Sequence, residues 1–195
     1  MNDTILWYTT RGAGAVSLVL LSAVVVLGML ASLRFEVPSW PRFLTTGLHR
    51  NLALTAVVFL ALHIVTAVVD PFTHLGWLAA VVPFSSYYRT LWLGLGVIAF
   101  ELLVAITITS LVRGAIGRSI WRAIHWLSYG SWPIAVLHGF GTGTDTWSAW
   151  MLAIDIICII AVLGSVVARL TFRSPDPLAA DRAAFRERVS RKVAK

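Results

Sequence analysis

Long apolar runs constrain the fold of this chain more than any other feature of its sequence. A run of about 20 apolar residues crosses a bilayer as an α-helix, because every backbone hydrogen bond is then made inside the segment. Only 13% of the 195 residues are charged, whereas roughly a quarter are charged in a soluble domain. The sequence therefore predicts an all-α, polytopic membrane bundle in one domain over residues 1–173, followed by a basic amphipathic tail over 174–195.

Five apolar runs predict about five membrane-spanning helices. These runs are Gly12–Leu33, Phe43–Val69, Thr90–Val112, Ser119–Phe140 and Thr146–Leu170. The segment Leu75–Phe84 is also apolar, but it is too short to span a bilayer. We expect it to form an interfacial or re-entrant helix on one face of the membrane.

The distribution of basic residues predicts the orientation of the chain. Arginines gather after the first run, after the third run and in the tail, whereas the other side carries only Arg11 and Arg89. The positive-inside rule then places the N-terminus outside and the C-terminus in the cytoplasm. Because this pattern accounts for the net charge of +7 as a topology signal, we expect lipid contact and no nucleic-acid partner.

Four of the five histidines lie in two of the runs. His49 and His63 belong to the second run, and His125 and His138 belong to the fourth. Ionisable residues inside spans are costly and usually functional. The two helices are separated by one span and so run parallel, which predicts one imidazole from each helix at each membrane level. His74 lies in the outer loop and is expected to be an ordinary surface histidine.

The spacing of these histidines predicts their directions. His49 and His63 are 14 residues apart, which places them about 21 Å apart along a helix and only about 40° out of alignment. His125 and His138 are 13 residues apart, which leaves them about 140° out of alignment on an ideal helix. We expect a kink at Pro133 to re-aim His138, because proline removes a backbone hydrogen bond.

Facing imidazoles at two levels are typical of two bis-histidine b-type haems, which would carry electrons across the membrane. A zinc ion normally takes three or four protein ligands, but each level offers two histidines and no nearby Asp, Glu or Cys. Structural histidines and a small transporter with incidental histidines are the other interpretations. A transporter more often has broken helices and an internal repeat, and neither is evident in the sequence.

Over residues 5–170 the chain resembles the ferric reductase-like transmembrane domain. This family includes ferric reductases, the membrane part of NADPH oxidases and the haem subunit of the bacterial methionine sulfoxide reductase system. Besides the histidine spacing, the resemblance rests on several short stretches. They are Thr10–Gly14, Leu62-His63 with Asp70–Phe72, Tyr88–Gly94, Trp121–Leu127, Leu137–Gly139 and Gly141–Asp145.

The resemblance implies an inner haem on His49 and His125 and an outer haem on His63 and His138. It implies a bacterial cell membrane, with electrons passing from the cytoplasm to an extracytoplasmic acceptor. Larger members carry a flavin and nicotinamide domain, whereas no Gly-rich phosphate loop occurs here. We therefore expect an oxidoreductase component whose donor is a separate flavoprotein or a membrane quinol. The alternative is a quinol-linked dihaem cytochrome b subunit of a larger redox complex.

Several other polar residues are candidates for the site. Arg11 and Arg89 outside, and Arg50 and Arg122 inside, could neutralise haem propionates or simply anchor the membrane interface. Glu101 and Asp155 lie within spans, where they could transfer protons, contact a quinone or pair with a neighbouring side chain. Small residues such as Gly94 and Gly96 could let helices or a macrocycle approach closely.

Overall fold

The computed structural model describes residues 2–33, 40–71, 73–172 and 185–186. These parts are mainly helical, as predicted, and they contain no strand. The helices are α1 (Asn2–Ser32), α2 (Arg42–Val69), η1 (Trp77–Ala80), α3 (Thr90–Leu111), α4 (Arg113–Ile116), α5 (Arg118–His125), α6 (Ser128–Thr142) and α7 (Ala149–Thr171). The predicted amphipathic tail lies outside the described residues, apart from Phe185 and Arg186.

Four helices of the described chain are long and apolar enough to cross a membrane, namely α1, α2, α3 and α7. They correspond to the first, second, third and fifth predicted spans. The helix of the first span begins at Asn2 rather than Gly12 and has 31 residues. It is therefore about 46 Å long, which exceeds the roughly 30 Å of a hydrocarbon core.

The predicted fourth span is divided into two helices. Its α5 part has 8 residues and its α6 part has 15, and Trp126 and Leu127 separate them. Pro133 lies inside α6, so the interruption between the two histidines precedes the expected proline kink. The N–H groups of Leu127, Tyr129 and Gly130 bond carbonyls three residues back. Each such residue adds about 20° of twist over an α-helix, which turns His138 toward alignment with His125.

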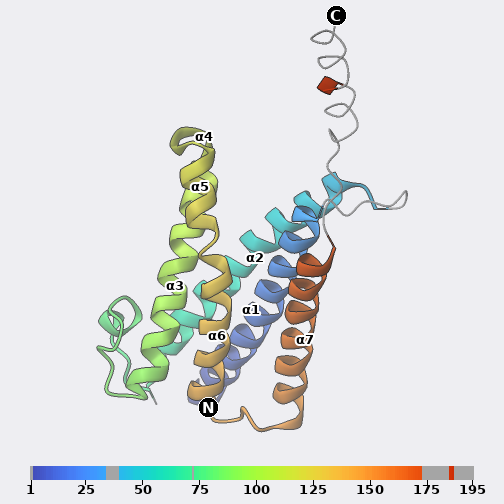
Figure 1. The fold of residues 1–195 in the computed structure, drawn as a ribbon. Coiled ribbons are helices and arrows are strands. Elements are labelled where there is room, and N and C mark those ends of the chain that lie inside the picture. The colour runs from blue at the N-terminus through green and yellow to red at the C-terminus, as the bar shows by residue number, and fades with distance from the viewer. Residues whose placement is uncertain (1, 34–39, 72, 173–184, 187–195) are drawn as a thin grey trace, which may run out of the picture.

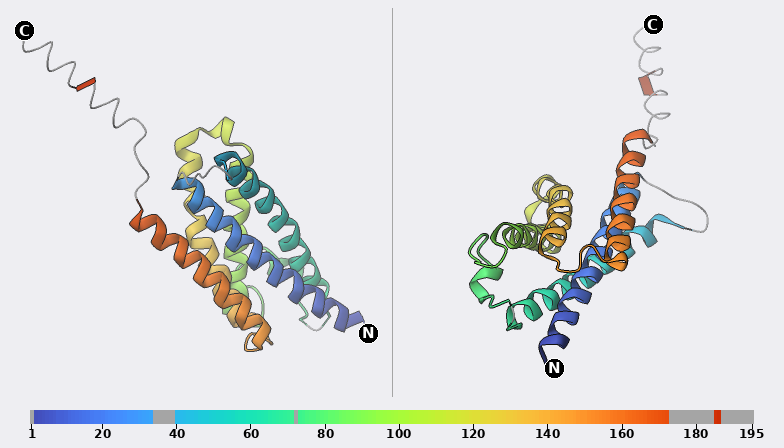
Figure 2. Two further views of the ribbon diagram at one scale, coloured as in Figure 1. Left: turned by 90° about the vertical axis from the view of Figure 1, so that its right-hand side faces the viewer. Right: turned by 90° about the horizontal axis from the view of Figure 1, so that it is seen from below.

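The helices form two groups with a gap between them. α1 packs along α2 and α7, and α3 packs along α6 and α5, while α1 and α6 make a smaller contact that joins the groups. Within the described chain, α2 has no comparable packing against α3 or α6. Figure 2 shows this separation in the view from below, with α3 and α6 on one side and α1, α2 and α7 on the other. His63 of α2 and His138 of α6 line a cavity between these groups.

The connection between α2 and α3 contains a shorter helix than predicted. We call the end of the molecule that holds this connection the outer end and the opposite end the inner end, after the orientation that the sequence predicts. Within the predicted segment Leu75–Phe84, only Trp77–Ala80 is helical, as one 3-10 turn. Phe84 adopts a left-handed backbone with φ of 62°, and its ring lies so close to Gly94 that no Cβ would fit there. This connection lies at the same end of the molecule as the N-terminus, whereas α4 and α5 lie at the other end (Figure 1).

Candidate functional site

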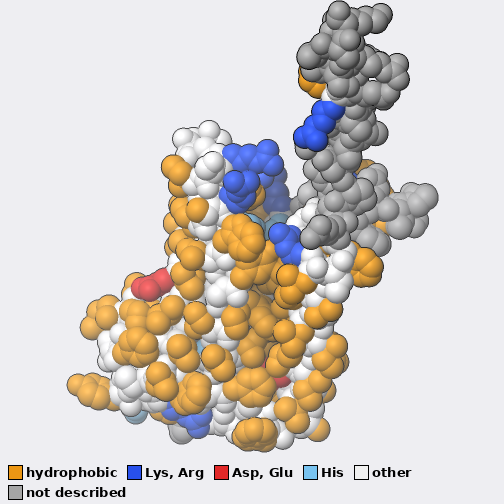
Figure 3. Space-filling view, viewed as in Figure 1, with side chains coloured by type: hydrophobic (Ala, Val, Ile, Leu, Met, Phe, Trp, Pro, Cys, Tyr) orange, Lys and Arg blue, Asp and Glu red, His pale blue; other side chains and the backbone are white. Residues whose placement is uncertain are grey.

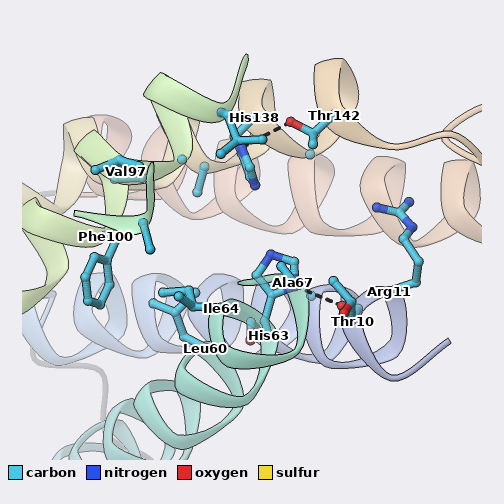
Figure 4. A pocket seen from close by; sticks show the side chains of 18 of the residues that line it. Thr10, Arg11, Leu60, His63, Ile64, Ala67, Val97, Phe100, His138 and Thr142 are labelled. Atoms are coloured by element: carbon cyan, nitrogen blue, oxygen red, sulfur yellow. Dashed lines mark hydrogen bonds between the residues drawn. The ribbon is translucent and has the colours of Figure 1, made fainter. Parts of the chain in front are cut away.

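Two pairs of imidazoles face each other across the gap. The ring centroids of His49 and His125 are 6.2 Å apart, with an interplanar angle of 63°. The ring centroids of His63 and His138 are 6.3 Å apart, with an interplanar angle of 82°. The structure thus brings together the same two pairs that the sequence predicts. Figure 4 shows His63 and His138 pointing toward one another from α2 and α6.

Three of the four imidazoles are held by a backbone carbonyl of a neighbouring helix. The Nδ1 atoms of His49, His63 and His138 lie 2.9, 2.8 and 2.9 Å from the carbonyl oxygens of Val24, Thr10 and Trp92. A carbonyl only accepts hydrogen bonds, so Nδ1 carries the proton in each ring. Each Nε2 therefore keeps a free lone pair, which is the state that binds a metal.

A glycine accompanies each of these three bonds. Gly28, Gly14 and Gly96 follow the accepting carbonyls by four residues, and a Cβ there would lie 3.6, 2.9 and 2.5 Å from the respective imidazole Nδ1. In an α-helix that carbonyl already accepts the N–H of the residue four positions later. Because the residue at that position is glycine, no side chain covers the carbonyl oxygen. Its second lone pair is therefore accessible to an imidazole from another helix.

His125 is held differently from the other three histidines. Its Nδ1 is buried and has no hydrogen-bond partner among the described residues. Instead, its ring stacks on Trp121, with centroids 5.0 Å apart and planes inclined by 28°. The Trp121 Nε1 donates to Ser110 Oγ at 3.2 Å.

A cavity of about 220 Å³ lies between the outer pair of histidines. Its apolar wall includes Leu60, Ile64 and Phe100, and Arg11 extends toward it from the opposite side (Figure 4). In the part of the chain that the structure describes, no three His, Cys, Asp or Glu side chains gather as a metal-ion site. Each facing pair of imidazoles therefore suits a group that takes one ligand from each side.

A family model described as ferric reductase like transmembrane component matches residues 13–137. The chain belongs to this family. The match includes His49, His63 and His125 and ends one residue before His138. Comparison with curated proteins and with solved structures gives no match.

Membership of the ferric reductase-like family makes the chain a multi-pass membrane protein of a group that transfers electrons across membranes and generally binds haem. The imidazole pairs fit this cofactor. A bond of roughly 2.0 Å from a metal to each Nε2, with each ring centre about 1.2 Å further on, requires centroids about 6.4 Å apart. The observed separations of 6.2 and 6.3 Å agree with that requirement.

The four predicted arginines occupy different surroundings. Arg11 lines the outer cavity and forms an ion pair with Asp145. Arg89 donates from Nη1 to the carbonyl of Gly141, which ties the start of α3 to the end of α6. Arg50 and Arg122 are exposed at the inner end. Their roles toward propionates stay predictions.

The ion pair between Arg11 and Asp145 carries a stability prediction. The two side chains are only 16% and 17% exposed, so removing one partner leaves a poorly solvated charge. We expect Asp145→Leu to lower the free energy of unfolding by about 3 kcal/mol. Thermal unfolding of Arg11→Met, Asp145→Leu and the double variant should show a double loss smaller than the sum of the single losses, whereas strict additivity would contradict the pairing.

The remaining predicted polar residues lie away from the imidazole pairs. Glu101 is exposed on α3, Asp155 is 3% exposed on α7, and His74 is exposed in the outer connection. Asp155 belongs to the buried stripe of α7 that also holds Met151 and Cys158. His74 takes no part in either pair, as expected.

Gly14 and Gly28 are parts of the site that were not predicted from the sequence. A signal was present, because these two glycines repeat the 14-residue spacing of His49 and His63. α1 and α2 run antiparallel, so Gly14 meets His63 and Gly28 meets His49. The carbonyl acceptors themselves have no signature in the sequence, since every residue carries one.

Proposed function

We propose that the chain binds two b-type haems, one between His49 and His125 and one between His63 and His138, and conducts electrons across a bacterial cell membrane. When bound, haem supplies one-electron redox chemistry. The observation that carries this proposal is the pair of imidazole separations, 6.2 and 6.3 Å, at two levels of the same bundle. Along α2, 14 residues correspond to about 21 Å between the levels.

In this proposal the residues of the chain hold the two haems and shield them from water. The carbonyl bonds to Nδ1 fix the tautomer and the direction of three rings, and they raise the basicity of Nε2. The apolar side chains around the outer pair exclude water, which influences a haem potential. Arg11 lines the cavity between His63 and His138. Its guanidinium would pair with a propionate of a haem at the outer level.

The inner end of the bundle suits an electron donor. Arg42, Arg50, Arg113, Arg118 and Arg122 are exposed there, and Figure 3 shows Arg side chains gathered at the end where α4 and α5 lie. A cluster of one sign steers an oppositely charged partner. The donor in this proposal is a cytoplasmic flavoprotein with an acidic face, or else a membrane quinol, and the acceptor is extracytoplasmic.

Haem content tests the cofactor part of the proposal. Purified full-length protein is expected to give a b-type reduced-minus-oxidised spectrum and about two haems per chain in a pyridine haemochrome assay. Low-spin spectra are expected for both haems, because both sites offer two imidazoles. A folded but colourless preparation, or one zinc per chain in place of haem, would contradict the proposal.

Electron passage is tested in sealed vesicles. Protein in liposomes loaded with ferricyanide is expected to reduce the trapped ferricyanide when a membrane-impermeant reductant is added outside, whereas protein-free liposomes should not. Adding a quinol or a reduced flavoprotein in place of the reductant distinguishes the two donor classes. Haem reduction without loss of internal ferricyanide would show that the chain does not conduct.

A further inference from the structure

The two imidazole pairs are unequal in the hydrogen bonding of their rings. At the outer level both rings donate Nδ1–H to a carbonyl, from His63 to Thr10 and from His138 to Trp92. At the inner level only His49 does so, through Val24. The Nδ1 of His125 is buried and has no partner among the described residues.

The neighbouring helix explains why His125 lacks an acceptor. α3 runs antiparallel to α5 and α6, so the level of His125 lies about 13 residues after Gly96, near Thr109 and Ser110. Neither of these is glycine. The hydroxyl of Thr109 donates to the carbonyl of Ala105 at 2.7 Å, and Ser110 accepts from Trp121. At this level the carbonyl of Ala105 already accepts a side-chain hydroxyl, and positions 109 and 110 hold no glycine that would expose a carbonyl.

His125 also differs from the other three histidines in its place along its helix. His125 is the last residue of the 8-residue helix α5, and the tightened turn at Trp126 and Leu127 follows it. His49 and His63 lie inside the 28-residue α2, and His138 lies inside α6. Among the described residues, the His125 ring is thus held by stacking against Trp121 and by no side-chain hydrogen bond.

A metal-binding imidazole without an Nδ1–H acceptor is a weaker ligand. The acceptor raises the basicity of the ring and fixes its direction, and losing such a partner typically costs about 10- to 100-fold in metal affinity. By this criterion His125 releases iron more readily than His49, His63 or His138.

We propose that the inner level is a ligand-exchange site: ferrous iron there gives up His125 and binds a small uncharged molecule of the carbon monoxide class, whereas the outer level does not. This inference rests on the proposed haem binding. The iron–Nε2 bond to His125 breaks and an iron–carbon bond forms, while no electron or proton is transferred and His125 is left neutral. His49 stays bound on the opposite side, held by Val24.

Carbon monoxide titration of the wild-type protein tests the stoichiometry. Full-length protein with both haems, reduced with dithionite, is expected to bind one carbon monoxide per two haems, so that about half of the Soret absorbance shifts. No binding at saturating gas, or binding to both haems with equal affinity, would overturn the inference. A protein with two low-spin haems that does not bind carbon monoxide would contradict this inference and agree with the proposed function. A protein without haem would contradict both the inference and the proposed function.

Variants identify the level that binds the gas. Trp121→Ala removes the stack on His125 and is expected to raise carbon monoxide affinity about tenfold, while Trp121→Phe keeps the stack and should stay closer to wild type. His74→Ala, outside both pairs, serves as the matched control with unchanged affinity. If both Trp121 variants bind two haems with wild-type gas affinity, the exchangeable ligand is not His125 and the inference fails.

Discussion

Replacing His138 by alanine is expected to leave the purified protein with about one haem per chain instead of two. His138 supplies one of the two imidazoles at the outer level, 6.3 Å from the ring of His63. Without it the outer group keeps a single ligand in an apolar cavity and is lost during purification. The pyridine haemochrome assay measures the change directly, and the remaining haem should keep a low-spin spectrum because the inner pair is intact.

Matched variants make this result specific. His125→Ala should also lower the haem content, with the outer low-spin signal retained, and His63→Ala combined with His138→Ala should give the same content as His138→Ala alone. His74→Ala should keep two haems, since His74 is exposed in the outer connection. Retention of two low-spin haems in His138→Ala would exclude His138 as a ligand.

Gly96→Ala is expected to disturb the outer site almost as strongly, although it replaces no ligand. A Cβ at this position would lie 2.5 Å from Nδ1 and 2.6 Å from Cε1 of His138, which is far inside van der Waals contact. The ring must move away, and its bond to the Trp92 carbonyl is lost. We expect a partial loss of outer haem and a high-spin fraction in the remainder, measured by absorption and electron paramagnetic resonance spectra.

Other glycines of the bundle provide the controls for this prediction. In Gly47→Ala on α2 and in Gly164→Ala on α7 the added Cβ meets no atom within 4 Å. Alanine favours a helix over glycine by about 1 kcal/mol, so neither variant should lose stability or haem. If Gly96→Ala were as benign as Gly164→Ala, the close approach of His138 to α3 would be wrong.

Much of the fold follows from local sequence patterns. Apolar runs predicted the helices α1, α2, α3 and α7, because the hydrophobicity of a segment is a property of that segment alone. The spacing of His49 and His63 predicted their common direction, because an uninterrupted α-helix has a constant twist. Gly14 and Gly28 have the same spacing on α1. The side of the site formed by α1 and α2 could therefore be predicted from the sequence.

The other half of the site depended on tertiary structure. His125 and His138 lie 13 residues apart, and a tightened turn at Trp126 and Leu127, which was not predicted, lies between them ahead of Pro133. Local overwinding of this kind has no fixed residue signature, and the two helices that it joins both pack on α3. The misalignment of these two histidines on an ideal helix was therefore predictable, whereas the tightened turn was not, and the contribution of Pro133 stays a prediction.

The sequence by itself determined which residues enter the membrane and which four histidines could meet at two levels. Only the tertiary structure decided how each ring is held, because the acceptors are backbone carbonyls on other helices. Such a carbonyl becomes available where a glycine lies four residues later and a neighbouring helix brings a ring against it. Three histidines meet that condition and His125 does not, which makes the two levels chemically different.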